Sequence, residues 1–188
     1  MATAQRAYAH KLFAGTSGNL SARAPEDTFL ITPSGTAYDT MQAQDIVRID
    51  MRGNALSGAL PPSSEWRLHA SVYACCPEVM SVFQTHSPFA TAFAVVGRPI
   101  PQILVEMGAF LGGDIPCVPF ETPGTWELGE AAANAILLGR NACLLESHGA
   151  LAVGKDVAQA YLRAEYLEEA VIIYHHALQI GEPKPQKA

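Results

Sequence analysis

The chain has 188 residues, 49% of them hydrophobic, which is enough for one compact domain with a sizeable core and excludes a disordered chain. A net charge of -6 and a charged fraction of 16% argue against a surface for nucleic acid, so we expect a small-molecule ligand. The four cysteines lack paired CxxC spacing, no signal peptide is evident, and every apolar stretch is too short to span a membrane. The sequence therefore predicts a cytoplasmic protein with a single domain, residues 1–188.

In the first half of the chain, apolar periodicity alternates with turn residues. The pattern predicts helices at residues 4–13 and 64–75 and strands at residues 28–32 and 45–50. Ser63 or Ser64 is the expected N-cap of the second helix. Glu65 would then lie in the first turn, where the helix dipole favours a carboxylate.

The second half of the chain continues this alternation. We expect strands at residues 79–83, 115–120, 142–145 and 150–153, and helices at residues 88–96 and 156–180. A further helix, capped by Thr125, ends near residue 138. Strands interleaved with helices, including antiparallel pairs, indicate the α/β class: a three-layer α/β/α domain with a mixed, largely antiparallel central sheet.

Two histidines lie where an apolar strand ends in a polar turn. His86 follows the strand expected at residues 79–83, and His148 lies between the strands expected at residues 142–145 and 150–153. An imidazole at a strand end can face a cleft from a fixed backbone, so two such rings would supply neutral ligands for a divalent metal. Glu65 adds an acid from a third segment. The alternative is that each histidine only satisfies buried backbone groups.

Three short loops are rich in glycine, hydroxyl and amide groups: residues 15–19, 32–35 and 62–65. Glycines let backbone N–H groups approach an anion closely, hydroxyls and amides add donors, and the helix that follows Ser64 adds a favourable dipole. The three loops together suit a phosphate group, although each loop alone is also an ordinary turn.

In order and approximate spacing, these motifs resemble those of the class II aldolase/adducin family. The resemblance covers nearly the whole chain and is carried by GTSGNLS (15–21), LITPSG (30–35), SSE (63–65), THS (85–87), GDIP (113–116) and HG (148–149). It implies a zinc-type divalent metal that holds a small sugar phosphate or related hydroxycarbonyl compound, so that a carbon–carbon bond beside the carbonyl breaks to an enediolate. It also implies a homotetramer with active sites at subunit interfaces.

The resemblance assigns expected roles residue by residue. Glu65 matches the acid that lies near the metal and transfers a proton, and His86 and His148 match two metal-ligand histidines. The positions that match the family's phosphate pocket are Gly18, Asn19, Ser34, Gly35, Ser63 and Ser64.

The chain departs from the family pattern at two places. A further ligand histidine normally stands two residues before the position of His86, and here that residue is Gln84, which we expect to be a ligand through its amide oxygen. Because an amide oxygen is a harder and weaker donor to zinc than imidazole, manganese, cobalt or magnesium is the alternative ion. Residues 100–113 lack the tyrosine that aldolases of the family carry there. Glu106 matches it by position only and is interpreted as a surface or interface charge.

The sequence thus predicts a metal-dependent carbon–carbon lyase of the aldolase type. A decarboxylase, dehydratase or epimerase on the same site is the alternative among enzymes, and a non-catalytic, adducin-like assembly domain is the alternative outside them. The apolar residues 100–111 would leave an exposed patch in a monomer, which favours the homotetramer. His69, one helical turn beyond Glu65, is interpreted as a packing or surface residue rather than a member of the site.

Overall fold

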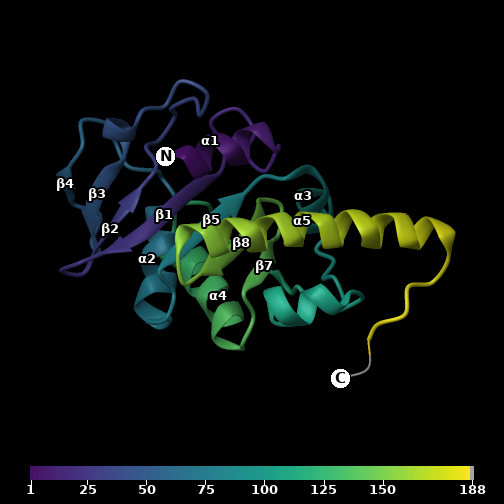
Figure 1. Ribbon diagram of the computed structural model, residues 1–188. Coiled ribbons are helices and arrows are strands. Elements are labelled where there is room, and N and C mark those ends of the chain that lie inside the picture. Colours follow the sequence, from purple (N-terminus) through teal and green to yellow (C-terminus); the bar gives the residue numbers. More distant parts are fainter. Residues whose placement is uncertain (187–188) are drawn as a thin grey trace.

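A sheet of eight strands runs through the structure, a computed structural model that describes residues 1–186 (Figure 1). The order is β4-β3-β2-β1-β5-β8-β7-β6, and neighbouring strands are antiparallel except for β6 and β7. The strands are β1 (Asn19–Ala24), β2 (Thr28–Ile31), β3 (Val47–Asp50), β4 (Ala55–Ser57), β5 (Ser81–Thr85), β6 (Cys117–Val118), β7 (Ala142–Leu145) and β8 (Gly149–Gly154).

Helices cover both faces of this sheet. On one face lie α1 (Ala2–Ala9), α3 (Pro88–Val95), the short π-helical turn η2 (Met107–Leu111) and α5 (Val157–Ile180), whose last turns extend beyond the sheet (Figure 1). The other face carries α2 (Trp66–Cys75) and α4 (Trp126–Leu137), and a 3-10 turn, η1 (Ala43–Asp45), precedes β3. Because neighbouring strand residues point to opposite faces, Phe83 joins the first core and Val82 the second. The expected three-layer α/β/α fold with a largely antiparallel sheet is confirmed.

Three strands differ from the prediction: β1 and β4 were not predicted, and β6 is shorter than expected. Strand β1 lacks a run of β-branched residues that would have predicted it, yet it pairs with β2 on one side and with β5 on the other. Pairing on both sides outweighs its weak intrinsic preference. The strand expected at residues 115–120 is reduced to Cys117–Val118, because Pro116 and Pro119 have no N–H to donate to a neighbouring strand.

Helix boundaries also shift. The first helix ends at Ala9 rather than residue 13, since Lys11 has a positive φ of 61°. Helix α2 begins at Trp66, so Glu65 is itself the N-cap and the expected cap at Ser63 or Ser64 was wrong. Thr125 and Asp156 do cap α4 and α5 with their side-chain oxygens. Within residues 1–186, none of the helices combines the length and hydrophobicity needed to cross a membrane.

Candidate active site

One cavity of about 320 Å³ is lined by all ten residues that the sequence singled out, together with Thr16, Ser17 and Pro33. The topology explains this convergence. Because β1, β2, β5 and β8 are antiparallel neighbours, the start of β1 meets the ends of β2 and β5 and the start of β8 at one end of the sheet. The loop before α2 joins them, since Ser34 N–H donates to the Pro61 carbonyl and Ser63 N–H donates to the Thr32 carbonyl.

The two strand-end histidines are adjacent. The ring centres of His86 and His148 are 5.3 Å apart and the rings are inclined by 70°. Two imidazoles that bind one zinc ion at about 2.0–2.1 Å have ring centres roughly 5 Å apart, so this arrangement fits a shared cation. Nδ1 of His148 is buried and has no hydrogen-bond partner among the described residues, which leaves it available as a ligand.

Both imidazoles are neutral at neutral pH. Burial, and to a lesser extent the neighbouring His148, lower the pKa of His86 to about 4. Burial also lowers the pKa of His148, an effect that the carboxylate of Glu65 partly offsets. The rings therefore keep free lone pairs, and the residues present fit a divalent cation. Among residues 1–186, no three His, Cys, Asp or Glu side chains form a ready metal-binding group.

Glu65 contributes the one carboxylate among the residues that line the cavity. Its side chain is only 7% exposed, and Oε2 accepts a hydrogen bond of 3.1 Å from the backbone N–H of Gly124. Gly124 lies in the loop before α4 and has a φ of +77°, a conformation that favours glycine. Oε1 of Glu65 has no hydrogen-bond partner among the described residues, so the carboxylate is anchored by one oxygen and free to exchange a proton at the other.

The glycine- and serine-rich loops form the neutral side of the cavity. Gly18 has a φ of +91°, and a Cβ there would lie 2.3 Å from the ring of Phe13. Gly35 has a φ of +67° and open space in place of a side chain. Among residues 1–186, no Lys or Arg lines the cavity. An anion in this cavity would therefore be bound by hydroxyl, amide and backbone N–H donors and by the dipole of α2.

A buried polar network behind the cavity was not predicted. His69 is fully buried, and its ring nitrogens contact Asn19 and Ser21 rather than Glu65. Nδ2 of Asn19 donates to Oε1 of Gln84 at 2.8 Å, so the amide oxygen expected to bind a metal already accepts a hydrogen bond. The one sequence signal for His69 was its place on the same helix face as Glu65. Glu106, in contrast, is exposed and lines a different cavity, between η2 and α5.

The α/β/α fold thus places an imidazole pair and a carboxylate beside a cluster of glycine- and serine-rich loops at one end of the sheet. The chain belongs to the class II aldolase and adducin family, since the family's sequence model, described as the Class II Aldolase and Adducin N-terminal domain, matches residues 1–175.

Named relatives identify the reaction type. A 5-methylthioribulose-1-phosphate/5-deoxyribulose-1-phosphate aldolase of Rhodospirillum rubrum is 44% identical over 170 residues, which cover 90% of this chain and 76% of the relative. An L-fuculose phosphate aldolase of Escherichia coli K12 is 39% identical over 171 residues, or 91% and 78% of the two chains. A solved L-fuculose 1-phosphate aldolase has a TM-score of 0.92 and 34% identity, covering 98% of this chain and 86% of its own. The chain is an aldolase-type lyase rather than a non-catalytic assembly domain.

Proposed function

We propose that this lyase is a zinc-dependent aldolase that cleaves ketose 1-phosphates. The observation that carries the proposal is the single cavity in which neutral anion donors, an imidazole pair and one carboxylate meet. The names of the relatives support the substrate class, because 5-methylthioribulose-1-phosphate, 5-deoxyribulose-1-phosphate and L-fuculose 1-phosphate are all ketoses phosphorylated at the first carbon.

In this proposal His86 and His148 hold the cation, and Gln84 is the weakest ligand, because one lone pair of its oxygen is taken by Asn19. When bound, the cation supplies the positive charge that stabilises the oxyanions formed as the bond beside the carbonyl breaks. The two neutral imidazoles leave that charge undiminished. Zinc suits them, and manganese, cobalt or magnesium is the alternative.

Glu65 provides the proton transfer. In the cleavage direction the Glu65 carboxylate takes up the proton of the hydroxyl group beyond the broken bond, and the carbon of that hydroxyl becomes an aldehyde. The fragment that keeps the phosphate is left as an enediolate, and the same proton is returned to its carbon. Oε1 of Glu65 has no hydrogen-bond partner among the described residues, while Gly124 holds Oε2 in place. We assign this oxygen to the transfer of the proton to and from carbon.

The phosphate is assigned to the neutral loops. Backbone and side-chain donors at Gly18, Asn19, Ser34, Gly35, Ser63 and Ser64 line the cavity, and α2 starts immediately after them. The positive end of the helix dipole attracts the phosphate, but less strongly than a buried Lys or Arg side chain would. Neutral recognition therefore allows the phosphorylated product to leave.

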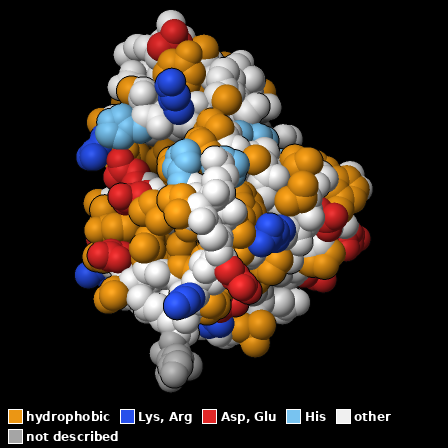
Figure 2. Space-filling view, turned by 90° about the vertical axis from the view of Figure 1, so that its right-hand side faces the viewer, with side chains coloured by type: hydrophobic (Ala, Val, Ile, Leu, Met, Phe, Trp, Pro, Cys, Tyr) orange, Lys and Arg blue, Asp and Glu red, His pale blue; other side chains and the backbone are white. Residues whose placement is uncertain are grey.

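We further propose a cytoplasmic homotetramer of single-domain subunits. Hydrophobic side chains cover much of the face at which the C-terminal end of α5 lies (Figure 2). Val105 and Ile180 are 73% and 89% exposed, which is unfavourable for an isolated subunit. Light scattering at working concentration tests this part, and a monomer would contradict it.

A substrate panel tests the function. Zinc-loaded protein is assayed for aldehyde release from L-fuculose 1-phosphate, 5-deoxyribulose 1-phosphate and 5-methylthioribulose 1-phosphate, with the unphosphorylated sugars as controls. We expect cleavage of at least one phosphate and loss of most of kcat/KM without the phosphate group. As a matched pair, His148→Ala should abolish cleavage, whereas His176→Ala, at an exposed histidine, should not. Equal rates with and without phosphate would refute the proposal.

A further inference from the structure

We propose that His69 is a positioning residue that fixes the orientation of the Asn19 and Gln84 amides, so that both present N–H groups to the substrate. The inference rests on the proposed function, since it concerns how the ketose phosphate is recognised. Both amides line the cavity, and His69 lies behind them on α2.

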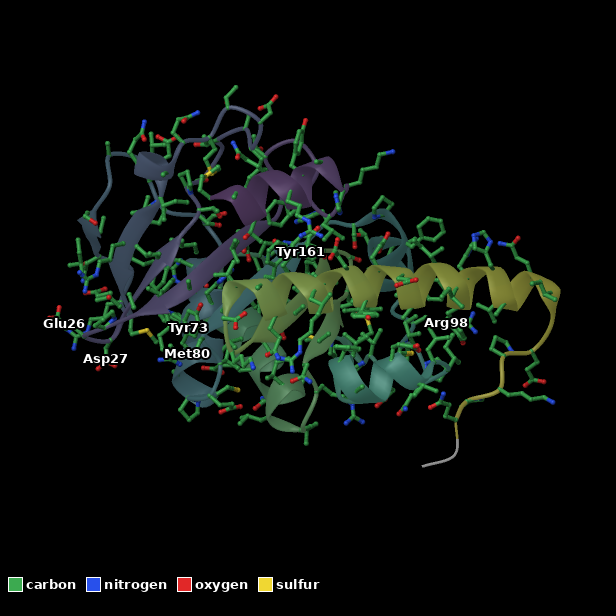
Figure 3. The ribbon with its side chains drawn as sticks, in the orientation of Figure 1. Glu26, Asp27, Tyr73, Met80, Arg98 and Tyr161 are labelled. Carbon is green, nitrogen blue, oxygen red and sulfur yellow. The ribbon has the colours of Figure 1, made fainter. Side chains whose placement is uncertain are left out.

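Five hydrogen bonds in series carry the inference, from Tyr73, where α2 packs against the sheet (Figure 3), to the backbone of Thr85. The Tyr73 hydroxyl is 2.7 Å from Ser21 Oγ, which is 2.6 Å from His69 Nδ1. The other ring nitrogen of His69 contacts Oδ1 of Asn19. Asn19 Nδ2 then donates to Gln84 Oε1, and Gln84 Nε2 donates to the Thr85 carbonyl at 3.3 Å.

The carbonyl oxygen of Thr85, at the end of the network, determines which group donates and which accepts in each hydrogen bond. A backbone carbonyl can only accept, so Gln84 must turn its NH₂ toward Thr85 and its oxygen toward Asn19. Asn19 must then donate to Gln84 and turn its own oxygen to His69. His69 consequently carries its proton on Nε2 and accepts at Nδ1 from the Ser21 hydroxyl, which in turn accepts from Tyr73.

Burial makes this direction stable. The network consists of the side chains of Ser21, Tyr73, His69, Asn19 and Gln84. Each is at most 4% exposed, so water cannot replace a lost hydrogen-bond partner. Burial also lowers the pKa of His69 to about 3, which keeps the ring neutral and leaves it one donor and one acceptor. Reversing the amides would set the oxygen of Gln84 against the Thr85 carbonyl, and two unpaired buried acceptors are unfavourable.

The direction of the hydrogen bonds in the network determines whether Asn19 and Gln84 present donors or acceptors to a ligand in the cavity. The oxygens of Asn19 and Gln84 are both used within the network, and each NH₂ group keeps one N–H that the network does not use. Donors at these positions suit the phosphate and hydroxyl oxygens of a sugar phosphate. Gln84, where the family pattern has a ligand histidine, therefore offers the substrate an N–H donor, while the second lone pair of its oxygen remains for the proposed cation.

Two substitutions at His69 separate positioning from packing. A glutamine amide reaches the place of Nε2 and can still donate to Asn19, whereas an asparagine amide reaches only the place of Nδ1. We expect His69→Gln to keep KM for the ketose phosphate within about 3-fold. His69→Asn should raise KM, and the dissociation constant of inorganic phosphate, by about 10-fold, with kcat changed less. Melting temperatures of both variants record any general loss of packing.

Equal KM values in the two variants, or a fall in melting temperature with no change in phosphate affinity, would overturn the inference. A second measurement needs no variant. Nitrogen NMR of the native protein should show the His69 proton on Nε2 throughout about pH 5 to pH 8, and a proton on Nδ1 would reverse the network. A protein with the Nε2 proton that cleaves no ketose phosphate would instead refute the proposed function and leave the direction of the network intact.

Discussion

Replacing Glu65 with glutamine is the sharpest test of the catalytic carboxylate. The amide has the same shape, and its oxygen can still accept the hydrogen bond that Gly124 N–H gives to Oε2 of Glu65. Only the capacity to take up and return a proton is removed. Since proton transfer typically contributes about 10²- to 10⁴-fold, kcat should fall by that factor, which raises the barrier by about 3–5 kcal/mol.

Stability should change much less than rate. Exchanging a charged acceptor for a neutral one in a retained hydrogen bond costs about 1 kcal/mol, or a shift of roughly 2–4 °C in melting temperature. Stopped assays of aldehyde release, metal analysis and calorimetry measure the three quantities. Glu130→Gln, at an exposed acid of α4, serves as the control. Undiminished kcat in Glu65→Gln would remove this carboxylate from the mechanism.

Three further predictions follow from the site and its supports. Gln84→His should raise zinc affinity at least about 10-fold in a calorimetric titration, and equal affinities would show that residue 84 faces away from the metal. Glu168 accepts two backbone N–H bonds of 2.8 Å at the start of α3, so Glu168→Gln should cost about 1–2 kcal/mol of unfolding free energy, unlike Glu169→Gln at its exposed neighbour. Because burial lowers the pKa of His69 from 6.5 to about 3, the unfolded state binds a proton that the folded state excludes. The contribution of neutral His69 to the free energy of unfolding is therefore complete above pH 6.5 and decreases as the pH falls toward 3. Urea unfolding should show a loss of about 2 kcal/mol at about pH 5. His69→Gln should remove that part, and an unchanged pH dependence in the variant would contradict the assignment.

The residues that line the cavity were predictable because their chemistry is local. Gly18 and Gly35 mark turns with positive φ, and His86 and His148 stand where apolar runs end, so each segment carries its own signal in the sequence. Their convergence required the family resemblance. Antiparallel pairing of β1, β5 and β8 brings these segments to one end of the sheet, and β1 itself had no clear pattern.

The buried residues that hold the site in place could not be predicted, since their hydrogen-bond partners are far away in the sequence. His69 meets Asn19 at a separation of 50 residues, and Glu168 meets the start of α3 at a separation of 79. Neither side chain differs locally from an ordinary helix residue. The N-cap of α2 was misplaced for a related reason, because Ser63 accepts a hydrogen bond from Glu65 N–H in the turn before the helix instead of capping it.

The most direct test of zinc-dependent cleavage at this site is a zinc titration of metal-free protein in which cleavage of a ketose 1-phosphate is recorded at each step. We expect no cleavage before zinc is added and a rate that rises with occupancy until one ion is bound per chain at His86 and His148. Full cleavage by the metal-free protein, or none at saturation with any substrate of the panel, would contradict it.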